Sequence, residues 1–317
     1  PIVFFHIFKN IMSKKNVLFI CSYTKKSGRG HLIRCLKLAK NLKKKNFDFF
    51  FLDIKGNINF KSKKYIKIEN LDKNIIFKYI VIDHYNFNYN DIKKLNLKSK
   101  YIYFDDNNRK KFYRPYLIIN GSPSADKKNY KFLENKTKLL LGPSYQILNI
   151  QKIKIDKTRN YLLLCFGYVD EKNLIPKFIR WIKKVGYNKK VLILVSNKSK
   201  NYNTIIRLAN EGKYYKVKNN LKNMDQIYAK SYLSIGAGGI MSLERIIYKI
   251  PSIIVSTDKN QIGNCTYIQK NSFGIYLGNY KKLKFNFFKK VFNEMQNTKK
   301  FIEIRENCKI FSFENSV

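Results

Sequence analysis

The sequence has few acidic side chains for its size. Its 317 residues include 21 aspartates and glutamates against 64 lysines and arginines, which leaves a net charge of +43. The basic residues are scattered along every segment and form no arm, zinc finger or basic-aromatic RNA-binding signature. Lys, Asn, Ile, Tyr and Phe crowd the chain, and AT-rich codons encode all five, so codon bias is favoured over a nucleic-acid or anionic membrane partner. A positive field still attracts an anionic nucleotide substrate.

Cysteines and long apolar runs are also scarce. The five cysteines include no C-x-x-C pair, so no zinc or redox motif is visible, and we expect a cytoplasmic protein. No apolar run reaches the ~18 residues that a membrane span needs, so we expect a soluble chain. The chain opens on Pro1, and Met12 resembles a more natural start. Residues 1–11 are therefore interpreted as an upstream extension or a fragment edge.

Short, continuous apolar runs alternate with helical patterns. Such runs fit strands buried on both faces, and the alternation is typical of parallel sheets with crossover helices. A polar linker over residues 149–159 predicts two domains, 14–150 and 159–317. The predicted strands are 16–21, 47–52, 79–83, 101–104, 116–119, 139–141, 161–166, 191–195, 214–217, 232–235 and 252–255. The predicted helices are 31–45, 89–97, 171–185, 203–211, 223–230, 241–249, 260–270 and 281–303.

This pattern predicts an α/β fold of two Rossmann-like domains that face a cleft. Ligands of such folds bind beyond the carboxyl ends of the strands. The first loop of this kind is Ser27-Gly28-Arg29-Gly30-His31, which follows an apolar strand and opens a helix. Glycine permits close backbone approach, and a helix N-terminus offers unpaired N–H groups. His31 suits a general base, although a packed or capping histidine is the alternative. Arg34 lies one turn further and either binds phosphate or is solvated.

The second loop is Gly236-Ala237-Gly238-Gly239, which again lies between a strand and a helix. The two loops together predict a pyrophosphate site. Glu244 lies about one turn into the helix, where its carboxylate either accepts bonds from ribose hydroxyls or complements the helix dipole.

Polar residues also follow successive strand ends, as the wall of a cleft requires. Each of them either lines the cleft or caps the next helix. They are Asp83 and Tyr85, Asp105 and Asp106, Asn120 and, in the second half, Asn260 and Gln261.

These motifs, taken in order over roughly residues 14–280, resemble the UDP-2,4-diacetamido-2,4,6-trideoxy-β-L-altropyranose hydrolase family of pseudaminic acid synthesis. That family is similar in fold to the glycosyltransferase B (GT-B) architecture. The motifs that carry the resemblance are Gly28-x-Gly30-His31-x-x-Arg34-Cys35-Leu36-x-Leu38-Ala39, Ile82-Asp83-His84-Tyr85, Phe104-Asp105-Asp106, Asn120, Leu141-Gly142-Pro143-Ser144-Tyr145, Gly236-Ala237-Gly238-Gly239 with Glu244, and Asn260-Gln261.

The resemblance implies hydrolysis of a UDP-sugar without metal or cofactor, in which water attacks the anomeric carbon with inversion and UDP leaves. It implies that His31 is the catalytic base. With the residue patterns, it predicts substrate contacts from Gly30, Arg34, Tyr85, Asp106 and Asn260. It predicts UDP contacts from Gly238, Gly239, Ser242 and Glu244. A glycosyltransferase on the same fold is the alternative, and a basic nucleic-acid-binding protein is the third hypothesis.

Four positions depart from the family pattern, and one of them is Asn149, where the family often has arginine. Tyr168 stands where the family has a second glycine in its Phe-Gly-Gly-x-Asp loop, and Ile240 and Met241 stand where hydroxyl residues are common. Ser242 is then the remaining hydroxyl after the glycine pair. Contacts to phosphate are accordingly expected from backbone N–H groups.

Overall fold

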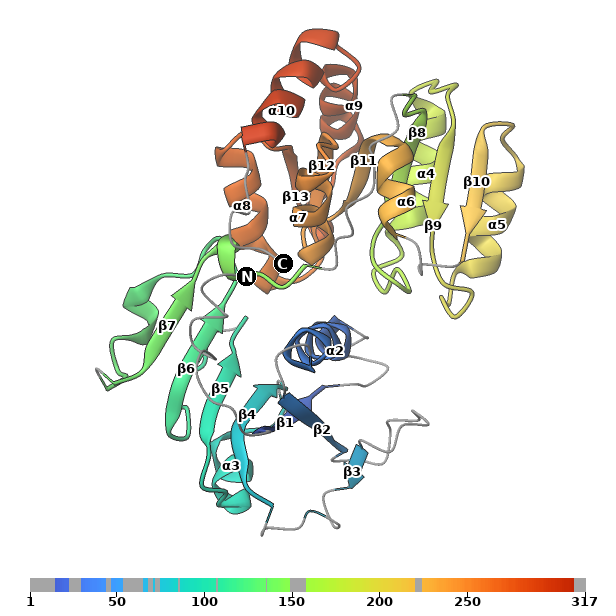
Figure 1. Ribbon diagram of the computed structural model, residues 1–317. Coiled ribbons are helices and arrows are strands. Elements are labelled where there is room, and N and C mark those ends of the chain that lie inside the picture. Colours follow the sequence, from blue (N-terminus) through green and yellow to red (C-terminus); the bar gives the residue numbers. More distant parts are fainter. Residues whose placement is uncertain are drawn as a thin grey trace. The chain divides into compact units, whose positions relative to one another are not determined.

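The chain folds into two compact units, one of residues up to 149 and one of residues 150–312. Each unit is a parallel sheet with crossover helices (Figure 1). The predicted extension at residues 1–11 and most of the predicted linker lie outside the described residues. The computed structural model describes residues 15–22, 30–43, 47–53, 65–67, 71, 75–84, 86–106, 108–134, 136–148, 158–219 and 224–310.

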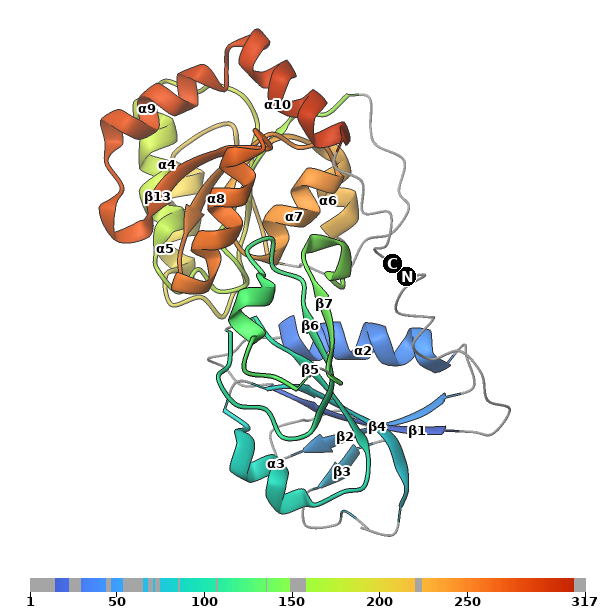
Figure 2. The same cartoon turned by 90° about the vertical axis from the view of Figure 1, so that its left-hand side faces the viewer.

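The first unit has a seven-stranded sheet with the order β3-β2-β1-β4-β5-β6-β7. Helices α2 and α3 cover opposite faces of this sheet (Figures 1 and 2). Its elements are β1 (Lys15–Cys21), α2 (Gly30–Lys43), β2 (Phe47–Asp53), β3 (Tyr65–Lys67), β4 (Phe77–Asp83), α3 (Tyr89–Leu95), β5 (Lys100–Phe104), β6 (Pro115–Asn120), β7 (Lys138–Leu141) and the 3₁₀ helices η2 (Lys127–Tyr130) and η3 (Pro143–Tyr145).

Strand β1 shows why its apolar run is continuous. Val17 and Phe19 belong to the core that packs on α2, whereas Leu18 and Ile20 belong to the core on the other face. All four side chains are fully buried. Both faces of the strand are therefore apolar, as the sequence predicted.

The second unit has a six-stranded sheet with the order β10-β9-β8-β11-β12-β13. Its elements are β8 (Tyr161–Cys165), α4 (Leu174–Lys184), β9 (Val191–Leu194), α5 (Tyr202–Asn210), β10 (Tyr215–Lys218), α6 (Met224–Lys230), β11 (Ser231–Ala237), α7 (Ile240–Ile247), β12 (Ser252–Ser256), η4 (Lys259–Gln261), α8 (Ile262–Lys270), β13 (Ile275–Asn279), η5 (Tyr280–Lys282), α9 (Phe285–Glu294) and α10 (Thr298–Ile310).

An aromatic cluster ties the C-terminal part of the second unit to α4. The ring of Trp181 lies 5.3 Å from that of Phe288 and 5.9 Å from that of Phe285, both in α9. Its other neighbour is Phe178, at 5.2 Å within α4. Aromatic pairs at such distances add to the stability that burial provides.

The prediction of one helix over residues 281–303 is wrong. Two helices, α9 and α10, replace it (Figure 2). The side chain of Asn297 accepts a hydrogen bond from the N–H of Lys299 at 2.9 Å, which is how an N-cap residue begins a new helix. Strands β3 and β13 were also not predicted. In β13 the apolar pattern is interrupted by Gly278, which has a φ of 105°. Within the described residues, no helix is both long enough and apolar enough to cross a membrane.

Candidate functional site

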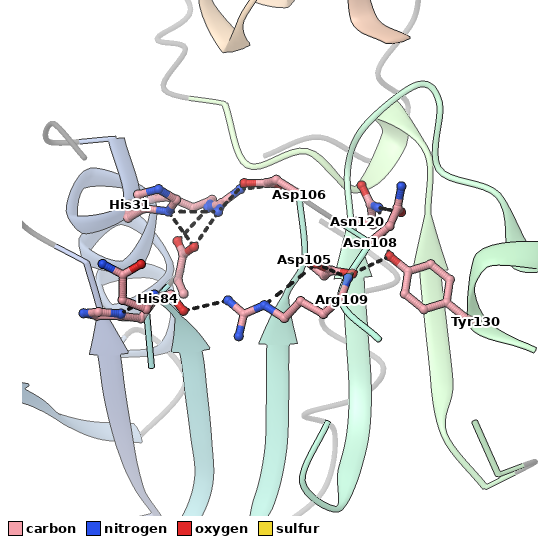
Figure 3. Close-up of polar contacts among 11 residues, drawn as sticks. His31, His84, Asp105, Asp106, Asn108, Arg109, Asn120 and Tyr130 are labelled. Carbon is pink, nitrogen blue, oxygen red and sulfur yellow. Dashed lines mark hydrogen bonds and ion pairs between the residues drawn. The ribbon is translucent and has the colours of Figure 1, made fainter. Parts of the chain in front are cut away.

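The ends of β1 and β4 lie side by side at the carboxyl edge of the first sheet. Cys21 pairs with Asp83 in the parallel ladder, and the N–H of Ser22 donates to the Asp83 carbonyl at 2.9 Å. The strand order reverses direction between these two strands, and doubly wound folds bind ligands at such a point. His31, in the first turn of α2 (labelled in Figure 3), contacts Asp83, the last residue of β4.

His31 and Asp83 form a buried pair. Nδ1 of His31 lies 2.7 Å from Oδ1 of Asp83, and the two residues are 8% and 1% exposed. An ionised carboxylate accepts hydrogen bonds but donates none, so Nδ1 carries the ring proton. Nε2 is then the nitrogen with the lone pair. The pair therefore has the geometry of an oriented general base.

Arg34 joins two carboxylates behind this pair. Its Nε and Nη2 donate to the two oxygens of Asp83 at 2.8 and 2.6 Å. Its Nη1 and Nη2 donate to the two oxygens of Asp106 at 3.2 and 2.9 Å. The guanidinium also lies over the ring of Phe104, 4.5 Å from its centre. This arrangement makes Arg34 a residue that orients Asp83; whether it also contacts substrate stays a prediction.

Arg34 also determines the charge of Asp83. Burial alone would raise the pKa of the Asp83 carboxyl, but the Arg34 charge and the hydrogen bonds from His31 and Arg34 outweigh it. The pKa of Asp83 is consequently held well below its usual range. Asp83 is therefore ionised at neutral pH and accepts hydrogen bonds from both Arg34 and His31.

Among the described residues, one group has the spacing of a metal site. His31, Asp83 and Asp106 each offer a ligand atom, all within 4.8 Å of one another. The guanidinium of Arg34 already binds both carboxylates, and a divalent ion would have to displace that cation. The arrangement thus favours the internal ion pairs over a metal ligand set.

A second polar network holds the segment after β5 that carries Asp106. Asp105 is 1% exposed and accepts the hydroxyl of Tyr130 at 2.9 Å and the backbone N–H of Arg109 at 3.1 Å (Figure 3). The amide of Asn120 donates to the Tyr130 hydroxyl at 2.9 Å. The strand-end residues Asp105 and Asn120 thus anchor the loop around the site.

In the second unit, the Gly236–Gly239 turn connects β11 to α7 at the corresponding switch point. Three successive carbonyl oxygens of this turn accept bonds from side chains of the same unit. The bonds are Arg245 Nη2 to Ala237 at 2.7 Å, Asn264 Nδ2 to Gly238 at 3.0 Å and the Ser242 hydroxyl to Gly239 at 2.6 Å. The N–H of Ser242 donates to the Gly239 carbonyl at 2.9 Å. The N–H groups of a helix's first turn and the helix dipole in general favour an anion, which makes this end of α7 a candidate anion site.

Glu244 and Ser242 are both buried in the first turns of α7. Glu244 is 7% exposed, and its Oε2 accepts the Tyr228 hydroxyl at 2.8 Å. Burial raises the pKa of Tyr228 well above its ordinary value, so the tyrosine remains a donor. Ser242 is 1% exposed and its hydroxyl stabilises the turn. Direct contacts of these two residues with UDP stay predictions.

The other predicted contact residues lie apart from these bonds. Gly30 is the exposed first residue of α2, where an added Cβ would meet no atom within 4 Å. Asn260 is exposed in η4. Tyr85 lies outside the described residues. Neither Arg245 nor Asn264 was predicted from the sequence as a site residue, although Asn264 lies four residues after the predicted Asn260.

Asp170 caps α4 in the loop where the sequence departs from the family pattern. Its two oxygens accept the N–H groups of Leu174 and Ile175 at 2.9 and 2.8 Å. Burial raises the pKa of Asp170 to about 6, although these two bonds lower it. Tyr168 in the same loop is 38% exposed, so its ring stays outside the core.

Part of the chain matches a known protein family. Residues 167–316 match the family model described as the glycosyltransferase family 28 C-terminal domain. The chain is 26% identical over 262 residues to an uncharacterized protein of Methanocaldococcus jannaschii, a match that covers 74% of this chain and 54% of that protein. It is 24% identical over 284 residues to the UDP-2,4-diacetamido-2,4,6-trideoxy-beta-L-altropyranose hydrolase of Campylobacter jejuni, covering 82% of this chain and 98% of the hydrolase.

Solved structures show the fold. MurG of Acinetobacter baumannii matches with a TM-score of 0.68 at 12% identity, covering 94% of this chain and 95% of that chain. Phytolacca americana UGT2, complexed with a UDP-fluoroglucose and pterostilbene, matches with a TM-score of 0.62 at 11% identity, covering 95% and 94%. The chain therefore has the GT-B fold of two Rossmann-like domains that the sequence predicted.

Proposed function

We propose that this protein hydrolyses a UDP-sugar, with UDP-2,4-diacetamido-2,4,6-trideoxy-β-L-altropyranose as the substrate. The observation that carries the proposal is the buried His31–Asp83 pair at the carboxyl edge of the first sheet. The similarity to the Campylobacter jejuni hydrolase, which extends over 98% of that enzyme, supports the choice of reaction and substrate.

We assign the general base of the reaction to His31 in the first unit. Nε2 of His31 accepts a proton from the attacking water, and the imidazolium that forms is stabilised by the Asp83 carboxylate at Nδ1. Arg34 keeps Asp83 ionised and fixes its orientation. A base positioned in this way contributes about 10²- to 10⁴-fold to the rate.

We assign the binding of UDP to the second unit. The diphosphate is placed at the N-terminus of α7, where backbone N–H groups and the helix dipole favour an anion. The carboxylate of Glu244 is assigned to the ribose hydroxyls. Ile240 and Met241 bring no hydroxyl, and the Ser242 hydroxyl donates to the Gly239 carbonyl. The contacts to the diphosphate are therefore assigned to backbone N–H groups.

The reaction then balances with these groups alone. The water oxygen bonds the anomeric carbon, and the bond from that carbon to the phosphate oxygen breaks. The electron pair of the broken bond leaves with UDP, and the proton of the water goes to His31. Attack from the side opposite to UDP inverts the anomeric configuration. Gly30, Asp106, Asn260 and Tyr85 remain proposed contacts to the sugar.

A nucleotide-sugar glycosyltransferase is the second candidate. The match of residues 167–316 to a glycosyltransferase domain favours it, because that match concerns the same half to which the UDP is assigned. The two candidates differ in the acceptor, which is water for the hydrolase and a hydroxyl compound for the transferase.

The deciding experiment supplies the purified protein with the proposed UDP-sugar and no acceptor. We expect release of UDP, and in ¹⁸O-labelled water we expect the label in the free sugar. Label in UDP would place the attack at phosphorus and reject the mechanism. UDP release that appears only after a hydroxyl acceptor is added would select the glycosyltransferase.

A further inference from the structure

Arg245 is the largest side chain among the fully buried residues and is 0% exposed. Its Nη2 donates to the Ala237 carbonyl at 2.7 Å. Its Nε and Nη1 are buried and have no hydrogen-bond partner in the part of the chain that the structure describes. Arginine remains protonated in proteins, so the second unit contains a cation with two unsatisfied nitrogens.

This guanidinium lies directly behind the Gly236–Gly239 turn. A Cβ built on Gly236 would come within 2.3 Å of both Nη1 of Arg245 and the carbonyl oxygen of Cys165. Only glycine at position 236 therefore leaves room for the guanidinium between the ends of β8 and β11. The sequence pairs this glycine with an arginine nine positions later on α7.

Burying a charge without full pairing costs free energy. Burial also lowers the pKa of Arg245 below its ordinary value, which reflects the same cost. An anion at the turn would offset this cost, because Coulomb interactions are stronger in a medium of low dielectric constant than in water.

We propose that Arg245 is a positioning residue for the diphosphate of a bound nucleotide. It holds the Ala237 carbonyl on the protein side of the turn, and it places a positive charge behind the first N–H groups of α7. This inference rests on the proposed function, since it concerns the same UDP, but it concerns a residue that does not touch the ligand. The gain in affinity from Arg245 should grow with the negative charge of the ligand.

Arg159 offers a matched control. Its Nη1 and Nη2 donate to the carbonyls of Lys249 and Tyr248, just after the other end of α7. Arg159→Met and Arg245→Met thus each remove one arginine that bonds backbone carbonyls next to the same helix. Only Arg245 lies at the glycine turn.

The test is calorimetric titration of both variants and the wild type with uridine, UMP and UDP. We expect Arg245→Met to weaken UDP binding about tenfold or more, UMP binding less, and uridine binding by less than about twofold. Arg245→Lys should retain part of the UDP affinity, because it keeps the charge. Arg159→Met should leave all three affinities unchanged.

Equal losses for uridine and UDP in Arg245→Met would overturn the inference, because they indicate a structural role only. Unchanged UDP binding would also overturn it. If the wild type binds none of the three ligands, the proposed function fails and this inference with it.

If Arg245→Met does not fold, the wild type itself provides the measurement. The side-chain Nε–H resonance of Arg245, assigned through Arg245→Lys, should shift on titration with UDP and not with uridine. A shift of equal size with uridine, or none with UDP, would contradict the proposal.

Discussion

Asp83 holds Nδ1 of His31 at 2.7 Å, although 52 positions separate the two residues in the sequence. The contact exists because β4 inserts next to β1, while α2 follows β1 directly. The pair therefore forms only when the first sheet has its native strand order. The role proposed for His31 therefore depends on the fold of the first unit.

His31→Gln should lower the turnover of the UDP-sugar by about 10²- to 10⁴-fold, because it removes the proton acceptor. UDP binding, which is assigned to the second unit, should not change. UDP release and calorimetric titration measure the two quantities. His84→Gln is the control, since the His84 ring packs against Phe87 and its Nδ1 accepts the N–H of Asn86. Unchanged turnover in His31→Gln would remove His31 from the mechanism.

Asp83→Asn should lower turnover and stability together. The free energy of unfolding should fall by about 3–5 kcal/mol at neutral pH, because Arg34 loses its ionised partner in a buried site. Since the pKa of Asp83 is lowered in the folded state, its contribution is present above the unfolded pKa of about 3.9 and is lost as the pH falls below that value. Chemical denaturation between pH 2 and 7 should show the two proteins converging in acid; a constant difference would contradict this account.

Asp170→Asn should change the pH dependence of stability in the opposite sense. The pKa of Asp170 is raised to about 6 in the folded protein, so protonation stabilises the fold. This contribution is complete below the unfolded pKa of about 3.9 and is lost as the pH rises through about 6. The free energy of unfolding of the wild type, relative to Asp170→Asn, should therefore decrease by about 1–3 kcal/mol over that range. Denaturation at several pH values would reveal a flat difference if Asp170 does not titrate there.

Glu244→Gln should weaken UDP binding about tenfold, because a charged acceptor for the ribose hydroxyls is lost. A UDP analogue without the 2′ and 3′ hydroxyls should bind both proteins equally. Tyr228→Phe keeps the carboxylate and removes only its donor, so it should have a smaller effect. Equal weakening of UDP and its dideoxy analogue would assign Glu244 a structural role.

Gly236→Ala should destabilise the second unit by about 1–3 kcal/mol, the usual cost of overpacking. The new Cβ would collide with Nη1 of Arg245 and the Cys165 carbonyl, each 2.3 Å away. Gly239→Ala is the control, because its Cβ would lie 3.6 Å from the nearest atom, in Gln261, at a φ of −78°. Thermal denaturation of the two variants should separate them; equal melting temperatures would contradict the close contact with Arg245.

Much of the fold could be predicted from the sequence because its strands are buried on both faces. Runs such as 17–21 are apolar without interruption, and that pattern has few alternatives in a chain with helices between the runs. The tail was harder, since Asn297 begins a second helix by a local hydrogen bond that periodicity does not show.

The sequence predicted where His31 and Asp83 lie in the fold, but it did not predict that the two residues contact each other. His31 and Asp83 were both expected near strand ends, yet their pairing depends on which strands are neighbours. Arg34 was expected at a phosphate or in solvent, whereas it bonds Asp83 and Asp106. The role of Arg245 could not be predicted from the sequence, because a lone arginine in a helix is most often a surface residue. Its complete burial is visible only in the structure.

The aromatic cluster of α4 and α9 has a practical consequence. Trp181 is the single tryptophan of the chain and lies wholly within the second unit. Its intrinsic fluorescence is a built-in reporter for one half of the molecule, while circular dichroism reads both. Comparing the two signals during unfolding separates the melting of the second unit from that of the first unit, which contains His31, without any label.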